Sequence, residues 1–401
     1  MPSSAPLAGS ALRAASMFRA DEVTRVVEGV GGVDRLGPLA AELGARRVFL
    51  VSDRGVVAAG HAERGRRSLE AAGLEVALFD DVHENPSSED VARGASAAAS
   101  FGPDLYVALG GGSSIDAAKG ANFIESCGGT MRDYWGHAKA TAPLRPMIAV
   151  PTTAGTGSEV QSFALVTDAE TGRKMACGDP TAAPRIALLD AELTVTMPRE
   201  VTAMTGLDTL AHAVESAVAK PRDPSTDGRT RDYARESFRL VLRAFPRVLE
   251  APDDVEARAE MLRASALGGL AIEHAMLGAA HSMANPLTRQ HGVPHGLAVG
   301  TMLPHVVRYN AEEAPARGIY ADLARAAGLT GATDDALAGA LAECVAELLL
   351  ATGLPARLTA HGVEETGLPA LATEAAEQWT AGFNPRAIDA PAFESLLRGA
   401  L

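Results

Sequence analysis

Three of the ten histidines in this chain, His281, His291 and His295, fall close together among small and apolar residues. A buried imidazole must find a hydrogen-bond or metal partner, because burying it unpaired costs free energy. Upstream, Asp208 and His212 stand four residues apart in a helical pattern, so they project from one helix face. Joined to imidazoles of the later stretch, this pair makes a mixed oxygen and nitrogen set suited to Fe(II) or Zn(II).

Taken singly, each of these residues also has an ordinary interpretation. An isolated histidine is more often a satisfied core or surface residue than a ligand. Asp and His four apart are common neighbours on solvated helices. The metal hypothesis therefore depends on what the rest of the chain contributes.

A glycine-rich turn, Gly110-Gly111-Gly112-Ser113, follows an apolar run at 104–109 and opens a helical pattern. Glycines permit a tight turn with exposed amides, and Ser113 is expected to cap the helix. Backbone N–H groups at a helix N-terminus can hold a pyrophosphate. The alternative is a purely structural turn, since the segment is not the G-x-G-x-x-G pattern.

Asp53 ends the apolar run 47–52, where a carboxylate can accept both hydroxyls of an adenosine ribose and would repel a 2′-phosphate. This placement favours NAD over NADP. The alternative is that Asp53 caps the helix after Gly55.

Two further segments have the composition of a cofactor site. Thr152 and Thr153 follow the apolar run 147–150 in a loop dense in hydroxyls and glycines, which could bond a ribose or nicotinamide amide. Lys174 follows the Thr171-Gly172 turn and could reach the cofactor, or could be a solvated surface lysine.

Apolar strands alternate with helical patterns in the first half of the chain, which predicts a parallel sheet covered on both faces. The expected strands are 47–52, 74–80, 104–109, 147–150, 163–168 and 185–190, the last two joined by the turn at 171–172. From Pro198 onward helical periodicity takes over, over 207–218, 227–248, 254–279, 296–310, 317–326 and 333–352. We expect an α/β domain over 1–195 and a helical domain over 196–401.

Composition agrees with two domains of a globular enzyme, because 401 residues exceed the size at which a single core keeps growing. A net charge of −14, without a basic stripe, argues against nucleic acid or an anionic membrane as partner. Three widely spaced cysteines predict neither a disulfide framework nor a cysteine zinc site, which fits a reducing cytoplasm. Residues 1–16 lack the basic start and apolar core of a signal peptide.

Four segments, 110–119, 151–159, 206–215 and 294–305, together resemble the iron-containing (group III) alcohol dehydrogenases, in the same order along the chain. The resemblance implies a Rossmann-like N-terminal domain and an all-helical metal-binding domain, the architecture of dehydroquinate synthase. It also implies a nicotinamide cofactor and a divalent ion. Residues matching the family's ligand set are Asp208, His212, His281 and His295. Residues matching its cofactor contacts are Asp53, Gly111, Gly112, Ser113, Asp116, Thr152 and Thr153.

One position departs from the family pattern. Where the family usually has a histidine four residues after the third ligand, assigned to proton transfer, this chain has Asn285. Asparagine can hydrogen-bond a substrate oxygen but cannot exchange a proton near neutral pH. We therefore expect Asn285 to contact the substrate, and His291 or a water chain through the cofactor ribose to carry the proton.

The expected function is reversible hydride transfer between NAD(H) and a small alcohol or aldehyde, mostly as aldehyde reduction, in a homodimer or larger homo-oligomer. NADP and Zn(II) are the alternative cofactor and metal. A sugar-phosphate cyclase of the dehydroquinate-synthase type also joins NAD to a metal, but typically through a Glu with two His, and the Asp208/His212 pair argues against it. A non-catalytic nucleotide-binding relative is the third possibility, with Asn285 as a mark of lost chemistry.

Overall fold

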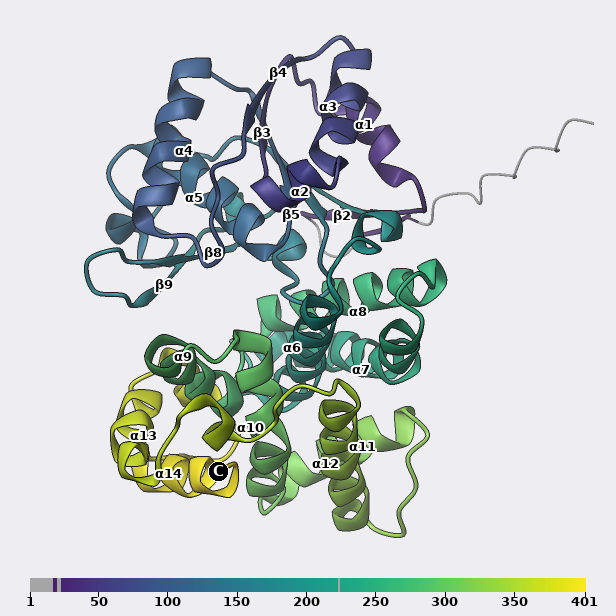
Figure 1. The fold of residues 1–401 in the computed structure, drawn as a ribbon, viewed down its shortest axis with the longest axis vertical. Coiled ribbons are helices and arrows are strands. Elements are labelled where there is room, and N and C mark those ends of the chain that lie inside the picture. Colours follow the sequence, from purple (N-terminus) through teal and green to yellow (C-terminus); the bar gives the residue numbers. More distant parts are fainter. Residues whose placement is uncertain (1–16, 20–22, 223) are drawn as a thin grey trace, which may run out of the picture.

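The protein has two halves, a sheet flanked by helices and a helical body, seen one above the other in the computed structural model (Figure 1). The structure describes residues 17–19, 23–222 and 224–401, so the prediction about residues 1–16 lies outside the described residues. The division into an α/β half followed by a helical half confirms the predicted fold class.

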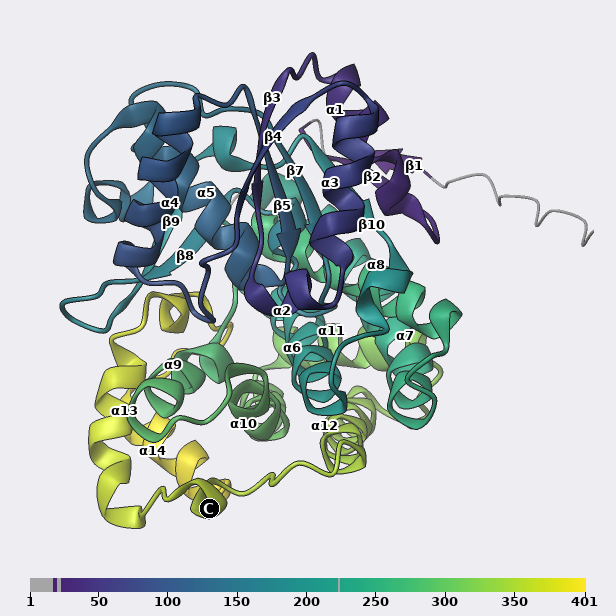
Figure 2. The same cartoon turned by 45° about the horizontal axis from the view of Figure 1, so that its top comes forward.

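The main sheet has the strand order β1-β2-β10-β7-β5-β3-β4, and all neighbouring strands except β1 and β2 run parallel (Figure 2). Its strands are β1 (Met17–Arg19), β2 (Arg25–Glu28), β3 (Arg47–Val51), β4 (Glu75–Phe79), β5 (Leu105–Gly110), β7 (Met147–Pro151) and β10 (Ile186–Leu189). The first two strands were not predicted, because their short runs, one with Arg at its end and one between Arg and Glu, lack a continuous apolar stretch.

Alternate side chains of the central strands enter two separate cores, as the twofold repeat of a strand requires. Val48 and Val107 pack on the face covered by α1 (Leu36–Glu42) and α3 (His61–Ala71). Phe49 and Tyr106 pack on the opposite face, against α4 (Ser88–Phe101) and α5 (Gly112–Cys127). Burial on both faces explains why these strands are apolar throughout.

A second, three-stranded sheet lies outside the main one, in the order β6-β9-β8. It consists of β6 (Gly136–His137), β8 (Phe163–Thr167) and β9 (Lys174–Gly178), with β8 and β9 antiparallel. The turn at 171–172 therefore joins β8 to β9 and not to the strand at 186, so the predicted connection was wrong. An antiparallel neighbour can follow a tight turn directly, whereas a parallel one needs a crossover.

The second half is a helical body with a large shared core. Its helices are α6 (Arg199–Val218), α7 (Asp227–Glu250), α8 (Val255–His274), α9 (Ala279–His291), α10 (His295–Asn310), α11 (Ala314–Ala326), α12 (Asp334–Ala351), α13 (Leu368–Ala376) and α14 (Ala390–Gly399). The helix predicted over 254–279 ends at His274, and α9 was not predicted. Pro286 lies inside α9 and no side chain of its N-cap residue Gly278 signals its start, so local cues for this helix are weak.

The loop after β7 connects the two halves closely. Thr209 on α6 donates its hydroxyl to the carbonyl of Ala154 at 3.0 Å. Gly157 has a left-handed backbone (φ 65°) and packs so tightly on α8 that a Cβ there would lie 2.5 Å from the Cα of Gly269. Only glycine fits this crossing, so the loop is held directly against both helices.

The three cysteines are free, as predicted. Within the described part of the chain, every helix is too short or too polar to span a bilayer.

Candidate active site

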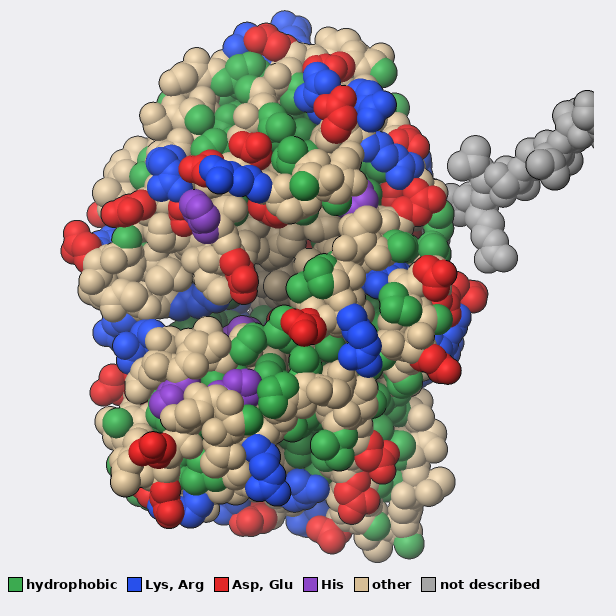
Figure 3. Space-filling view, viewed as in Figure 1, with side chains coloured by type: hydrophobic (Ala, Val, Ile, Leu, Met, Phe, Trp, Pro, Cys, Tyr) green, Lys and Arg blue, Asp and Glu red, His purple; other side chains and the backbone are tan. Residues whose placement is uncertain are grey.

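A cavity of about 880 Å³ lies between the two halves, where Figure 3 shows the surface hollowed. Its sheet side is formed by the carboxyl ends of β3 and β5 and the loop after β7, which is where ligands bind in open parallel sheets. Its helical side is formed by α6, α8 and the starts of α9 and α10. Residues far apart in the sequence therefore face a common space.

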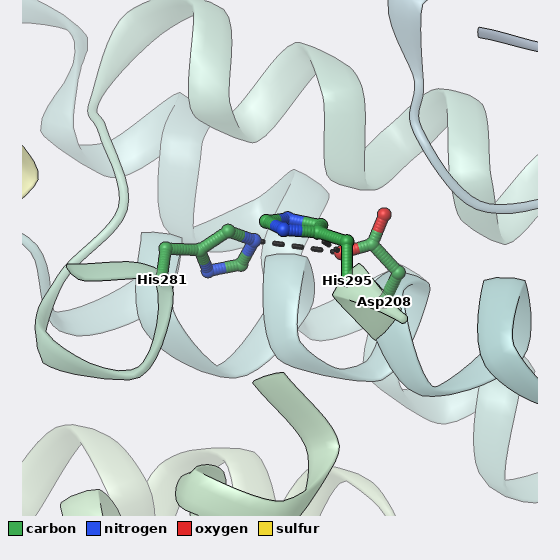
Figure 4. Close-up of side chains that lie close together, drawn as sticks. All are labelled: Asp208, His281 and His295. Atoms are coloured by element: carbon green, nitrogen blue, oxygen red, sulfur yellow. Dashed lines mark ion pairs between the residues drawn. The ribbon is translucent and has the colours of Figure 1, made fainter. Parts of the chain in front are cut away.

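The helical side carries the predicted metal ligands. Asp208 and His212 lie one turn apart on α6, and His281 and His295 come from the first turns of α9 and α10. Each imidazole turns its Nε2 toward Asp208 Oδ1, at 3.3 Å for His212, 3.4 Å for His281 and 3.9 Å for His295. Asp208, His281 and His295 offer ligand atoms within 4.8 Å of one another (Figure 4).

These residues fit a divalent ion. Ligand atoms at about 2.0–2.1 Å from one ion in a tetrahedral arrangement stand about 3.4 Å apart, close to the separations here. Asp208 Oδ1 and His281 Nε2 are buried and have no hydrogen-bond partner among the described residues. Buried polar atoms without a partner are costly unless an ion satisfies them.

Electrostatics prepare the same atoms for metal binding. Burial alone would raise the pKa of Asp208, but the imidazole of His212 and its neighbours attract the negative charge and hold the pKa well below its usual range. Burial lowers the pKa of His295 to about 3 and also lowers the pKa of His212. An ionised carboxylate beside neutral imidazoles is the donor state that a metal needs.

His281 is the exception, and the reason is Glu215. Burial would lower the pKa of His281, but interactions with the carboxylates of Asp208 and Glu215 outweigh it and raise the pKa to about 9. Glu215 Oε2 lies 2.5 Å from His281 Nδ1, and Oε1 accepts from the amide of Ala280 at 2.7 Å. A carboxylate behind a ligating imidazole fixes its orientation and leaves Nε2 for the ion.

Glu215 was missed from the sequence although a signal existed. It follows Asp208 by seven residues and His212 by three, which places all three on one face of α6. Its side chain is 2% exposed, and a buried carboxylate requires a partner.

On the sheet side, the glycine-rich turn leads from β5 into α5. Gly111 is the N-cap residue of α5, and no side chain caps the helix, so the predicted capping by Ser113 was wrong. Ser113 Oγ instead accepts from the amide of Asn85 at 3.1 Å. A Cβ at Gly112 would lie 2.5 Å from Thr156 Cγ2, so the loop after β7 packs directly on this turn.

Three more of the polar residues predicted around the cofactor, Thr152, Thr153 and Asp53, also line this cavity. Thr152 and Thr153 do so beside the glycine-rich turn, since Thr152 N bonds to Gly110 O at 3.0 Å. Asp53 caps α2 (Arg54–Ala58) through the amide of Val56 at 3.0 Å. Its other oxygen accepts from Ser114 at 3.0 Å. Asp53 thus has the capping role left open above, while the ribose role stays a prediction.

Asp116 belongs to a buried network that ties α5 to the loop after β7. Its carboxylate accepts from Ser158 Oγ at 2.5 Å, and Lys119 Nζ donates to the carbonyls of Ser158 and Phe163 at 2.7 and 2.9 Å. Burial lowers the pKa of Lys119 to about 8 and raises the pKa of Asp116. This network holds the two segments that line the sheet side.

Lys174 lines the cavity and donates to Asn85 Oδ1 at 3.2 Å. Asn85, missed from the sequence, has a left-handed backbone (φ 53°), a conformation that asparagine tolerates better than most residues. It links Lys174 to Ser113 through its own side chain and amide. The Asn-Pro dipeptide at 85–86 is a turn signal that could have drawn attention to it.

The two predicted catalytic residues lie apart from the metal cluster. Asn285 lines a second, adjoining cavity and donates to Gln378 Oε1 at 3.0 Å. His291, the last residue of α9, is absent from the lining of both cavities. The catalytic role of each stays a prediction, and the placement of His291 does not support it.

One cavity thus combines a glycine-rich turn of the kind that binds dinucleotides with an Asp/His cluster of the kind that binds a metal. This combination defines a class of metal- and nucleotide-dependent enzymes. Comparison with known proteins is specific on this point. The family described as iron-containing alcohol dehydrogenase matches residues 23–191, and its C-terminal domain matches residues 202–401. The chain belongs to the iron-containing alcohol dehydrogenase family and is an oxidoreductase.

Individual relatives agree with this assignment. A 1,3-propanediol dehydrogenase of Klebsiella pneumoniae is 35% identical over 89% of this chain and 92% of its own. The crystal structure of a 1,3-propanediol oxidoreductase superposes with a TM-score of 0.89 at 33% identity, covering 95% of this chain and 98% of its own. Sulfoacetaldehyde reductase of Bifidobacterium kashiwanohense, solved with NAD+, gives 0.83 at 28% identity over 94% and 96%. These comparisons give no support to the cyclase or to the non-catalytic alternative.

Proposed function

We propose that this protein is an NAD-dependent reductase of small aldehydes that also runs in the reverse direction, with one divalent ion held by Asp208, His212, His281 and His295. Aldehyde, NADH and a proton become alcohol and NAD+. The observation that carries the proposal is the cavity itself, which has the glycine-rich turn on one side and the buried Asp/His cluster on the other.

On the helical side, the chain orients the metal ligands and buries most of them. The ion, when bound, supplies a Lewis acid that stabilises negative charge on the substrate oxygen. Glu215 holds the His281 ring, and Asp208, His212 and His281 are buried. Charge interactions are stronger where water is excluded.

On the sheet side, the chain binds and places the dinucleotide. NAD(H), when bound, supplies the hydride chemistry. The amides at the start of α5 and the side chain of Ser113 receive the pyrophosphate, and Thr152 and Thr153 lie beside that turn to bond the nicotinamide end. Asp53 receives the adenosine ribose, which favours NAD over NADP. Asp116 and Lys174 complete the wall.

The proposal keeps Fe(II) as the metal, because the family is iron-containing, with Zn(II) as the alternative that the same ligands accept. We place the domain boundary near residue 195, which precedes α6. A homodimer or larger assembly and a cytoplasmic location stay predictions.

An aldehyde panel tests the function. Metal-free protein reconstituted with Fe(II) or Zn(II) is assayed for NADH oxidation, and NADPH is run in parallel. We expect stoichiometric metal, turnover only in the reconstituted protein and preference for NADH. Reduction of no aldehyde by protein that holds its metal and binds NADH would reject the proposal.

A further inference from the structure

A second cavity of about 1070 Å³ adjoins the first. Residues that line both cavities are Asn85, Phe163, Lys174, Met276, His295 and Trp379. The second cavity therefore begins at a candidate metal ligand, His295, and leads away from it. A substrate that reacts beside His295 has room to extend its remaining chain into this space.

Arg222 lines the second cavity and is held in place by contacts other than an ion pair. Its Nη1 donates to the carbonyl of Glu273 at 3.3 Å, and its Cζ lies 4.9 Å from the centroid of the Phe163 ring. The ring itself is fixed, because a Cβ at Gly178 would lie only 2.3 Å from it. Among the described residues, Arg222 has no carboxylate partner, and most of its five N–H donors have no bonding atom.

The two other arginines of this cavity differ from Arg222. Arg289 is ion-paired with Glu374, which also accepts from Gln290. Arg173 is exposed and stacks over Trp135 at 5.8 Å. Burial would raise the pKa of Glu374, but the bond from Arg289 lowers it, and the nearby charge of Arg173 adds to that lowering. A half-buried arginine that faces a cavity and has no carboxylate partner among the described residues is available to an anionic ligand.

We propose that Arg222 binds an anionic oxygen group, a carboxylate, phosphate or sulfonate, at the far end of the aldehyde or alcohol substrate. The inference rests on the proposed function and narrows it to a substrate class. A guanidinium fixed on an aromatic face presents a planar fork that matches such a group with two parallel hydrogen bonds. Arg173, at the edge of the same cavity, adds positive potential, and Figure 3 shows Lys and Arg side chains at the left end of the hollow.

Steady-state kinetics of the metal-loaded enzyme test this assignment. ω-Oxocarboxylates of increasing chain length are compared with their methyl esters, which keep the shape and lose the charge. We expect kcat/KM to favour the acid by about tenfold or more, the value of a hydrogen bond to a charged group. Oxosulfonates and oxophosphonates then rank the three anions.

Variants localise the effect. Arg222→Gln should remove the preference, mainly by raising KM for the acids, and should leave the esters unchanged. Arg222→Lys should restore part of it. Arg308→Gln is the matched control, since Arg308 bonds to Pro304 O, lies outside both cavities and loses the same charge. A preference that survives Arg222→Gln would overturn the assignment.

A binding measurement gives a readout that does not need turnover. Calorimetry of the complex with metal and NAD+ should show glutarate binding, and Arg222→Gln should weaken it by about tenfold or more while metal content and NAD+ affinity stay the same. Equal kcat/KM for acids and esters would reject the anion site while the reductase stands. If no aldehyde turns over, the proposed function fails. Glutarate binding then decides the anion site by itself, and absence of glutarate binding would reject that site.

Discussion

The two walls of the candidate active-site cavity are built from different parts of the chain. The sheet wall depends on backbone, with amides at the start of α5 and glycines that let the loop after β7 approach. The helical wall depends on side chains. Asp208, His212 and Glu215 come from α6, and His281 and His295 come from the starts of α9 and α10. A wall made of backbone is sensitive to added atoms, and a wall made of side chains is sensitive to lost ones.

Removing a ligand from the helical wall should have the largest effect. Asp208→Ala or His295→Ala should abolish metal retention and lower kcat by about 10³-fold or more, since the ion contributes several kcal/mol to the transition state. NAD+ affinity should be unchanged, because the sheet wall is intact. Asp322→Ala on the surface is the control, and metal analysis with NAD+ titration makes the measurement. An active, metal-free variant would refute the ligand assignment.

Glu215→Gln tests whether support behind a ligand matters. The amide keeps the shape but loses the charge that holds His281 Nδ1, so metal affinity should fall by about 10-fold to 100-fold, as for other residues behind metal ligands. Competition with a chelator measures it. Glu236→Gln, at a surface pair with Arg239, should change nothing. Equal metal affinity in both variants would reduce Glu215 to an anchor for the start of α9.

Adding an atom to the sheet wall should give the opposite pattern. Gly112→Ala places a Cβ 2.5 Å from Thr156 Cγ2. Overpacking of this kind costs 1–3 kcal/mol, so the Kd for NAD+ should rise by about tenfold or more while metal content stays the same. Gly228→Ala, at a helix position with nothing within 4 Å, is the control. Unchanged NAD+ binding would mean that the turn does not hold the cofactor.

Asp53 separates two roles on the same wall. Asp53→Gly should raise the NADP/NAD ratio of kcat/KM by about tenfold, because a like charge no longer faces the 2′-phosphate. Asp53→Asn keeps an oxygen that can cap α2 and removes only the charge. A ratio unchanged in both variants would leave capping as the role of Asp53.

The smallest effect is expected outside both walls, at Asn285 in the second cavity. Asn285→His should change kcat by less than about threefold and add an ionisation near pH 6.5 to the pH–rate profile. A profile identical to that of the wild type would make this position a bystander in proton transfer.

The sequence predicted the two walls unequally. Asp208 and His212 could be paired because four residues span one helical turn, and Gly111 and Gly112 could be placed because a turn links strand to helix. His291 could not be placed, because α9 went unrecognised. Ten residues at about 100° each turn it about 80° away from His281.

Contacts without a local signature escaped prediction for a similar reason. Asn85 reaches Lys174 across 89 residues, and Arg222 lies over a ring 59 positions earlier in the chain. The β8–β9 pairing was missed because the second strand, Lys174–Gly178, has only a short apolar centre. Strand and helix patterns are local, whereas such neighbours depend on how the elements are stacked.

The tight crossing of Gly157 on Gly269, together with the bond from Thr209 to Ala154, holds the loop after β7 against α8 and against α6, the helix that carries the candidate ligands Asp208 and His212. This contact would therefore set the distance between a bound cofactor and a metal held by the candidate ligands. Enlarging either glycine would shift one reactant against the other, and a misplacement of about 1 Å can slow a reaction by about 10²-fold without touching a bound molecule. A lower kcat with unchanged affinities for the metal and for NAD+ would show that this crossing sets the distance between them.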